Sequence, residues 1–350
     1  MPRRRPSRFA GNCVIIMRPQ DILKALVKGE PVERTICLPI TMMFAASFAG
    51  HSYHDYATKA SIQAESQARL AEAFELDHVG VLSDPAVEAS DWGATVAYFE
   101  EQPPAIDERT PLIEEPGDLA KLASPDPAAG KRMSNRIEAV AAMRRRLGPD
   151  LIVEGWVEGP CAESSDLRGI NTLMTDFFDD EDFVDALFER VVDVAIKFAR
   201  LQIDAGADVI GVGDAAASLV GPGIYEKFVW PWEKKLIDAI HQAGAMTRLH
   251  ICGNTNFALE KIGRLGCTVV DLDSMVDIRA ARAAMPNQVI DGNLDPVRLV
   301  LQRSARDITE ALKKCRDQAG PRYIAAAGCE IPRGTPPENL KAFSDFVRQT

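Results

Sequence analysis

The feature that most constrains the fold is a repeated order of amphipathic stretch, glycine and short apolar run. Eight short apolar or β-branched runs are present, and several of the longer stretches between them carry apolar residues at three- and four-residue spacing before a glycine. The runs are 34–41, 77–83, 151–157, 207–213, 245–251, 267–273, 287–293 and 322–328. Strands that alternate with helices are typical of a parallel sheet, and eight such units close a barrel. We therefore predict an α/β fold, a (β/α)8 TIM barrel.

The parts of the chain outside these units are assigned as follows. Residues 1–18 are basic, with an apolar run of only four residues, and we expect a disordered lead-in there. Residues 19–350 are expected to form one barrel domain that begins with a helical extension. A tract rich in proline and turn residues, 101–130, separates the second and third strands, and we interpret it as an insertion on the same domain.

Composition excludes several kinds of partner. The chain has a formal net charge of −11, which disfavours a general affinity for nucleic acid or an anionic membrane, because both need clustered positive charge. No apolar stretch approaches the length of a membrane span. The seven cysteines are odd in number and unevenly spaced, so we expect reduced thiols and a cytoplasmic protein.

Polar side chains follow nearly every predicted strand. In a (β/α)8 barrel the active site lies at the carboxyl ends of the strands, so chemistry should gather at these positions. The residues are Thr41, Ser83, Asp84, Glu158, Asp214, His250, Cys252, Asp273, Asp291, Asn293, Cys329 and Glu330. A barrel with a purely structural role has no reason to place carboxylates and metal-binding groups there.

Three of these residues could bind one metal ion. His250 and Cys252 follow the fifth predicted strand and Cys329 follows the eighth, and strand ends across a barrel mouth converge on one pocket. Two thiolates and one imidazole suit zinc, with the fourth position open to water or substrate, as in catalytic sites. In the alternative, His250 bonds to backbone and both cysteines are inert core residues, because His-x-Cys is a short and common pattern.

At these residues the chain resembles a known family. The segments HICGNT (250–255), GNLDP (292–296) and GCEIPRGTPPENLKAF (328–343) look like those of the uroporphyrinogen decarboxylase superfamily, and within it the cobamide-dependent methyltransferase branch. The resemblance extends from about Pro19 to the C-terminus. Members of the methyltransferase branch hold zinc through His-x-Cys and a distant Cys, which implies zinc ligation by His250, Cys252 and Cys329.

One segment distinguishes the two branches. Decarboxylases of the family carry arginines after the first strand that hold the substrate's carboxylates, whereas the corresponding segment here, 40–57, contains no arginine. A cavity for a polyanionic porphyrinogen needs fixed positive charge. The resemblance therefore implies methyl transfer between a corrinoid and a small thiol or methyl donor, and the sequence leaves the direction of transfer and the donor open.

The sequence also indicates how the cofactor would be supplied, and the strand ends offer acid–base residues. None of the five histidines lies in an Asp-x-His-x-x-Gly pattern that would bind cobalt, so we expect the methylcobamide to arrive on a separate corrinoid protein. Asp273, Asp291 and Glu158 are the candidate catalytic groups, as a fourth zinc ligand, a partner of His250 or a general acid. Each could equally be a helix cap or a turn residue.

Two other functions compete with methyl transfer. The first is a uroporphyrinogen decarboxylase that anchors its substrate differently. The second is a binding protein that keeps the barrel only as a scaffold, because a fold does not by itself define a function.

Overall fold

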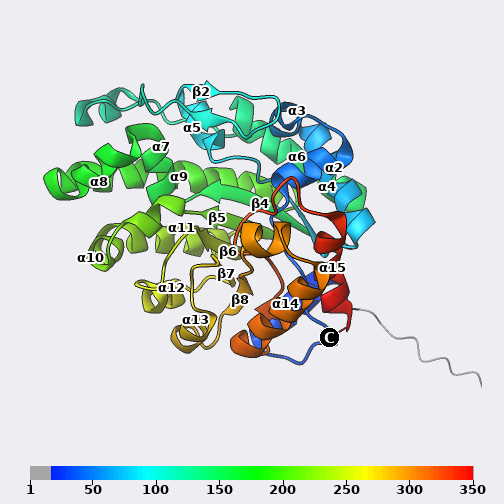
Figure 1. Cartoon of the computed structure of the whole chain (residues 1–350). Coiled ribbons are helices and arrows are strands. Elements are labelled where there is room, and N and C mark those ends of the chain that lie inside the picture. The colour runs from blue at the N-terminus through cyan, green and yellow to red at the C-terminus, as the bar shows by residue number, and fades with distance from the viewer. Residues whose placement is uncertain (1–16, 350) are drawn as a thin grey trace, which may run out of the picture.

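Seven parallel strands form one curled sheet at the centre of the molecule (Figure 1). The computed structural model describes residues 17–349, so all but the last two residues of the predicted lead-in lie outside the described part. The sheet has the order β1-β4-β5-β6-β7-β8-β9. Its strands are β1 (His78–Gly80), β4 (Ile152–Glu158), β5 (Val209–Gly213), β6 (Met246–Ile251), β7 (Val269–Leu272), β8 (Val289–Gly292) and β9 (Tyr323–Ile324).

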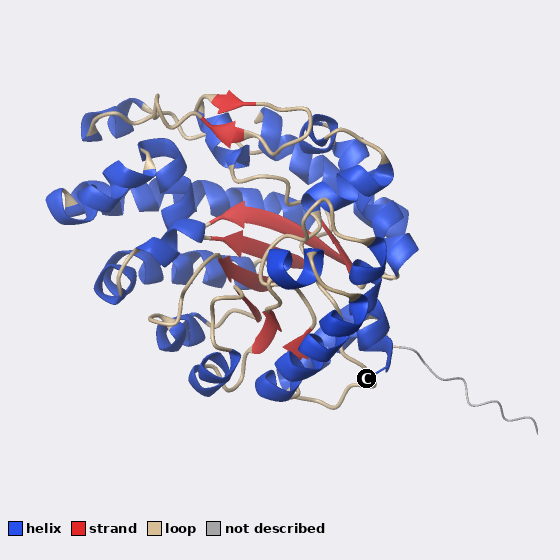
Figure 2. Ribbon diagram, viewed as in Figure 1, coloured by secondary structure: helices blue, strands red, loops and turns tan. Residues whose placement is uncertain are grey.

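Helices surround the outer side of this sheet, as a barrel of strand–helix units requires (Figure 2). The α-helices are α1 (Pro19–Lys28), α2 (Met42–Ala49), α3 (Tyr53–Thr58), α4 (Ala60–Phe74), α5 (Ala86–Trp92), α6 (Lys131–Leu147), α7 (Pro160–Arg168), α8 (Ile170–Asp179), α9 (Glu181–Asp204), α10 (Pro222–Ile224), α11 (Trp230–Gln242), α12 (Leu259–Leu265), α13 (Ile278–Ala284), α14 (Ala305–Ala319) and α15 (Pro337–Gln349). Short 3-10 or π turns are η1 (Pro116–Lys121), η2 (Ala215–Leu219), η3 (Tyr225–Val229) and η4 (Pro296–Leu301). No described helix is long and apolar enough to cross a membrane.

The first predicted strand, 34–41, is not a regular strand. It makes one parallel bridge, between Cys37 and Ala325, with hydrogen bonds on either side of it to the residues around β9. Pro39 has no N–H to continue the ladder. Towards β1 the backbone pairing is replaced by a side chain, because the Asp77 carboxylate accepts from the Cys37 N–H at 3.0 Å and pairs with Arg34. The eighth position of the barrel is therefore occupied, but only by a short segment.

The predicted insertion and N-terminal helix are both present. Between β1 and β4 the chain forms α5, the small antiparallel pair β2 (Val96–Ala97) and β3 (Ala105–Ile106), η1 and α6. The helix α1 packs Ile22, Leu23 and Leu26 against the first residues of several strands, such as Ile152. Its apolar face therefore closes the amino end of the barrel.

Three layers of side chains fill the barrel, because alternate residues of each strand point inward. The lowest layer, under α1, is apolar and contains Ile152, Val209, Val269 and Val289. Two residues further along the strands, the layer is polar and contains His78, Glu154, Arg248, Asp271 and Asp291. The third layer contains Trp156 and His250 and lies next to the carboxyl ends of the strands.

Candidate metal centre

His250, Cys252 and Cys329 lie together at the carboxyl end of the barrel. One ligand atom from each residue lies within 4.8 Å of the other two. Among residues 17–349 this is the one group of three or more His, Cys, Asp or Glu side chains close enough to hold a metal ion. His250 is the fifth residue of β6, Cys252 lies just beyond that strand, and Cys329 follows β9. The Nε2 atom of His250 is 3.0 Å from Sγ of Cys252, which is 3.9 Å from Sγ of Cys329.

This donor set fits a zinc ion. Two sulfurs and one imidazole nitrogen are ligands that zinc prefers, and three protein ligands leave one tetrahedral position for a further group. The pKa values of the two thiols shift in opposite directions. The hydrogen bond from Cys252 and the contact with His250 lower the pKa of Cys329 against the effect of burial. The bond to Cys329 and burial raise the pKa of Cys252. A lowered pKa favours the thiolate form of Cys329, and the thiolate is the form that binds metal.

A carboxylate and an arginine lie directly beneath His250. Burial opposes a charge on the imidazole, but Asp271 outweighs burial and raises the pKa of His250 well above its usual value. Oδ2 of Asp271 is 3.2 Å from Nδ1 of His250 and 2.8 Å from the guanidinium of Arg248. Burial raises the pKa of Asp271, yet the positive charges of Arg248 and His250 prevail and lower it.

The polar middle layer was missed by sequence analysis, which considered only the ends of the strands. Arg248, on β6, contacts three carboxyls on three other strands, those of Glu154 on β4 (3.3 Å), Asp271 on β7 (2.8 Å) and Asp291 on β8 (2.8 Å). The signal was a charged residue in the middle of an apolar run, as in AMTRLHI and LIVEGWV. Arg248 is also two residues before His250, a spacing that puts both side chains on the same face of a strand.

Two of the three predicted catalytic acids have other roles in the structure. Asp291 was expected at the barrel mouth, but β8 continues to Gly292, so this carboxyl is buried in the polar layer beside Arg248. Asp273 accepts a hydrogen bond from the N–H of Met275 at 2.8 Å and begins the turn that follows β7. This turn role is the alternative that the sequence had left open.

Glu158, the third predicted acid, lies at the end of β4 in a group of buried carboxyls. Its Oε1 accepts from Nε1 of Trp156 at 3.0 Å, and its own N–H donates to Glu88 at 2.9 Å. Burial, and after it the nearby carboxyls of Glu88 and Asp166, raise the pKa of Glu158 well above its usual value. The Trp156 ring lies over Gly211 of β5. This position must be glycine, because a Cβ there would lie 2.1 Å from the ring.

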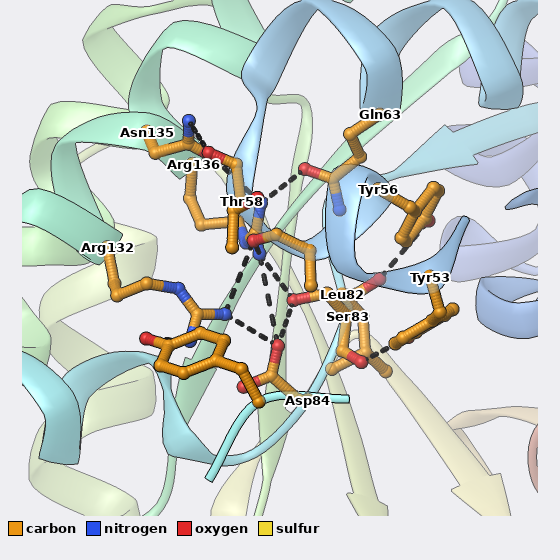
Figure 3. A network of polar contacts seen from close by, with 12 residues as sticks. Tyr53, Tyr56, Thr58, Gln63, Leu82, Ser83, Asp84, Arg132, Asn135 and Arg136 are labelled. Carbon is orange, nitrogen blue, oxygen red and sulfur yellow. Dashed lines mark hydrogen bonds and ion pairs between the residues drawn. The ribbon is translucent and has the colours of Figure 1, made fainter. Parts of the chain in front are cut away.

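The segment that follows β1 is held rigidly by buried polar contacts, shown in Figure 3. Arg132 donates to Asp84 at 2.7 Å, and Arg136 donates to Ser83 Oγ at 2.5 Å and to Gln63 at 2.8 Å. Tyr53 donates to the Ser83 carbonyl from the opposite side. Both guanidinium groups are thus engaged by the protein's own acceptors.

Comparison with known proteins gives one family for almost the whole described chain. The family described as "Uroporphyrinogen decarboxylase (URO-D)" matches residues 18–350. The chain is 32% identical over 340 residues to the "Methylcobamide:CoM methyltransferase MtbA" of Methanosarcina mazei, covering 94% of this chain and 97% of that protein. It is 27% identical over 343 residues to a uroporphyrinogen decarboxylase of a Synechococcus strain, covering 92% and 94%.

A solved structure shows the same fold. A "methyltransferase from Methanosarcina mazei" superimposes with a TM-score of 0.87 over 95% of this chain and 99% of that chain, at 22% sequence identity. The superposition confirms the predicted barrel, including its curled parallel sheet.

Proposed function

The chain belongs to the uroporphyrinogen decarboxylase family, and its relatives within that family identify it as a methyltransferase; from this membership we propose that it transfers a methyl group between a corrinoid protein and a small thiol, at a zinc ion held by His250, Cys252 and Cys329. The observation that carries the proposal is the convergence of these three ligand atoms within 4.8 Å at the open end of the barrel.

In this proposal the chain supplies the ligands for zinc and one candidate acid–base group. A zinc ion bound here would lower the pKa of a coordinated thiol and so supply a thiolate at neutral pH. In the direction of thiol methylation, a sulfur–carbon bond forms, the cobalt–carbon bond breaks, the electron pair of that bond stays on cobalt as cob(I)amide, and the thiol proton is released. Glu158 is our candidate acid–base group, because the contacts of Asp273 and Asp291 give those carboxyls structural roles.

A porphyrinogen decarboxylase is less consistent with the site. The segment 40–57 forms α2 and α3 and carries no arginine, and the nearby guanidinium groups of Arg132 and Arg136 are already paired inside the protein. Unpaired carboxylates of a porphyrinogen would be costly to bury. The decarboxylase relatives are also less similar to this chain than the methyltransferase is.

This chain offers an exposed apolar surface beside the candidate metal centre to which a corrinoid protein could bind. Leu219, Phe257 and Met275 follow the successive strands β5, β6 and β7, and 62%, 37% and 62% of their respective surfaces are exposed. The three loops touch: a Cβ on Gly253, next to Cys252, would lie 3.1 Å from Ser218 Oγ, and Asn256 donates to the Met275 carbonyl at 3.1 Å. Exposed apolar side chains grouped beside a site are typical of a protein interface.

A cytoplasmic location, with reduced thiols, remains part of the proposal.

Zinc content tests the proposed centre. We expect about one zinc per chain in the wild type, with two sulfur ligands by X-ray absorption and three after addition of a productive thiol such as CoM. Cys329→Ser should lose most of the zinc together with methyl transfer from methylcobalamin. Cys315→Ser is the matched control, since this thiol is buried but lies outside the ligand group. Equal zinc in Cys329→Ser and the wild type would refute the assignment.

The docking surface is tested by comparing two methyl donors. Replacing Leu219 and Met275 together by serine should raise the KM for a methylated corrinoid protein at least tenfold, and leave the KM for free methylcobalamin within about twofold. Val27→Ser is the control, because Val27 is also partly exposed but lies on α1 at the amino end of the barrel. Equal effects on both donors would place the interface elsewhere.

A further inference from the structure

The polar layer around Arg248 buries several charged groups inside the barrel, which carries a large desolvation penalty. Arg248, Asp271 and Asp291 are each 0 to 2% exposed, and Glu154 is 5% exposed. Barrel interiors are normally filled by branched apolar side chains, and a buried ion pair is often no more stabilising than apolar residues of the same volume. The lowest layer of this barrel follows the usual rule, so the polar layer above it requires a reason other than stability.

The contacts of the polar layer point to His250. Asp271 is paired in register with His250 on the neighbouring strand, and its Oδ2 is shared between Nδ1 of His250 (3.2 Å) and the guanidinium of Arg248 (2.8 Å). Nδ1 of His250 has no aligned hydrogen-bond partner among the described residues, and Oδ2 of Asp271 is the carboxylate oxygen that lies within ion-pair distance of it. Nε2 is the atom that faces the thiols, 3.0 Å from Cys252. The two nitrogens of one ring therefore face a carboxylate on one side and the ligand group on the other.

Arg248 is itself fixed from several strands. Besides the carboxyls of Glu154 and Asp291, it donates to the carbonyl of Leu38 at 2.9 Å, in the segment that closes the barrel. Any other rotamer of Arg248 would break several of these buried contacts at once. Asp271 thus has one defined position beneath the imidazole.

We propose that Asp271, held in place by Arg248, is the positioning residue of the metal centre: it accepts the Nδ1 proton of His250 and thereby presents Nε2 to the metal. The inference rests on the proposed function, since it concerns the same three ligands. An imidazole can bind a metal through either nitrogen, and the partner of the other nitrogen selects the tautomer. Neither Asp273 nor Asp291 has a contact that would perform this task.

Zinc affinity of two matched variants tests the proposal. Asp271→Asn and Asp291→Asn each replace one carboxyl that contacts Arg248 by an amide of the same shape, but only Asp271 contacts His250. In competition with a chelating dye, Asp271→Asn should bind zinc about 10- to 100-fold more weakly than the wild type. Asp291→Asn should remain within about twofold. Equal affinities of Asp271→Asn and the wild type, or equal losses in both variants, would overturn the inference.

A measurement on the wild type covers the case in which Asp271→Asn does not fold. In zinc-loaded protein labelled with 15N-histidine, His250 should be the tautomer protonated at Nδ1, with a slowly exchanging, downfield proton. A His250 ring with its proton on Nε2, or a freely exchanging Nδ1 proton, would overturn the inference while leaving zinc binding intact. A wild type that binds no zinc at all would instead overturn the proposed function and this inference with it.

Discussion

Buried carboxyls occur in two regions of the barrel, and the regions differ in whether a cation accompanies them. Around Arg248, the carboxyls of Glu154, Asp271 and Asp291 surround one guanidinium at 2.8 to 3.3 Å. Beyond the carboxyl end of β4, Glu158 lies near the further carboxyls of Glu88, which is buried, and Asp166, which is partly exposed. In the first region the pKa of Asp271 is lowered by Arg248 and His250 against the effect of burial, and in the second the pKa of Asp166 is raised by burial and by Glu88.

The difference shows that carboxyls of equal burial can serve different chemistry. Burial alone raises the pKa of an acid, and only a nearby positive charge can reverse that effect. Asp271 has such a charge next to it, so it can hold the Nδ1 proton of a neutral imidazole as an acceptor. No positive charge is among the strongest influences on the pKa of Glu158, which is raised, so this carboxyl is suited to donate a proton.

Removal of the cation should have the largest effect. Arg248→Met leaves three carboxyls buried without their shared partner, and we expect a loss of about 3–5 kcal/mol in the free energy of unfolding, measured with urea at pH 7. Arg306→Met is the control, because Arg306 is exposed and, among residues 17–349, forms its ion pair with Glu310. Its effect should stay within about 0.5 kcal/mol. A small loss in Arg248→Met would mean that the surrounding carboxyls are all protonated.

The second prediction concerns the region without a cation and depends on pH. Burial, and after it Glu88, raises the pKa of Asp166 to about 8. Between the pKa of the unfolded chain, about 3.9, and this value the folded state binds the extra proton, so stability decreases as the pH rises, by up to about 1.4 kcal/mol per pH unit. Asp166→Asn should remove this part of the slope.

Unfolding of the wild type and Asp166→Asn at pH 5 and pH 8 measures the difference. The variant should gain stability relative to the wild type at the higher pH. Asp193→Asn, a change at an exposed carboxyl on α9, should show the wild-type slope. An equal slope in Asp166→Asn and the wild type would show that Asp166 titrates as an ordinary carboxyl.

The smallest effect is expected for Glu158→Gln. Burial and the neighbouring carboxyls raise the pKa of Glu158 well above its usual value and so favour its neutral form, and a glutamine oxygen can still accept from Trp156. We expect a change below about 1 kcal/mol in unfolding free energy and an unaltered tryptophan fluorescence spectrum. A loss of methyl transfer in this stable variant would support the acid–base role, whereas a loss of several kcal/mol in stability would mean that Glu158 is charged.

The sequence alone determined the order of the elements and brought His250, Cys252 and Cys329 together as one candidate group. The recurrent helix–glycine–strand pattern predicted the barrel, since such periodicity is local and needs no knowledge of contacts. His250, Cys252 and Cys329 could be grouped because the carboxyl ends of parallel strands meet at one end of any barrel. Neither conclusion depends on which residue lies opposite which.

The tertiary structure decided everything that depends on register. Whether 34–41 pairs as a strand was settled by Pro39 and by the Asp77 side chain, which lies 40 residues beyond Cys37. The role of Asp271 follows from its position opposite His250 on the next strand, and the burial of Asp291 from the same register one strand further. A shift of one residue in pairing would turn these side chains to the other face, so no local pattern could identify the carboxyl that faces the imidazole.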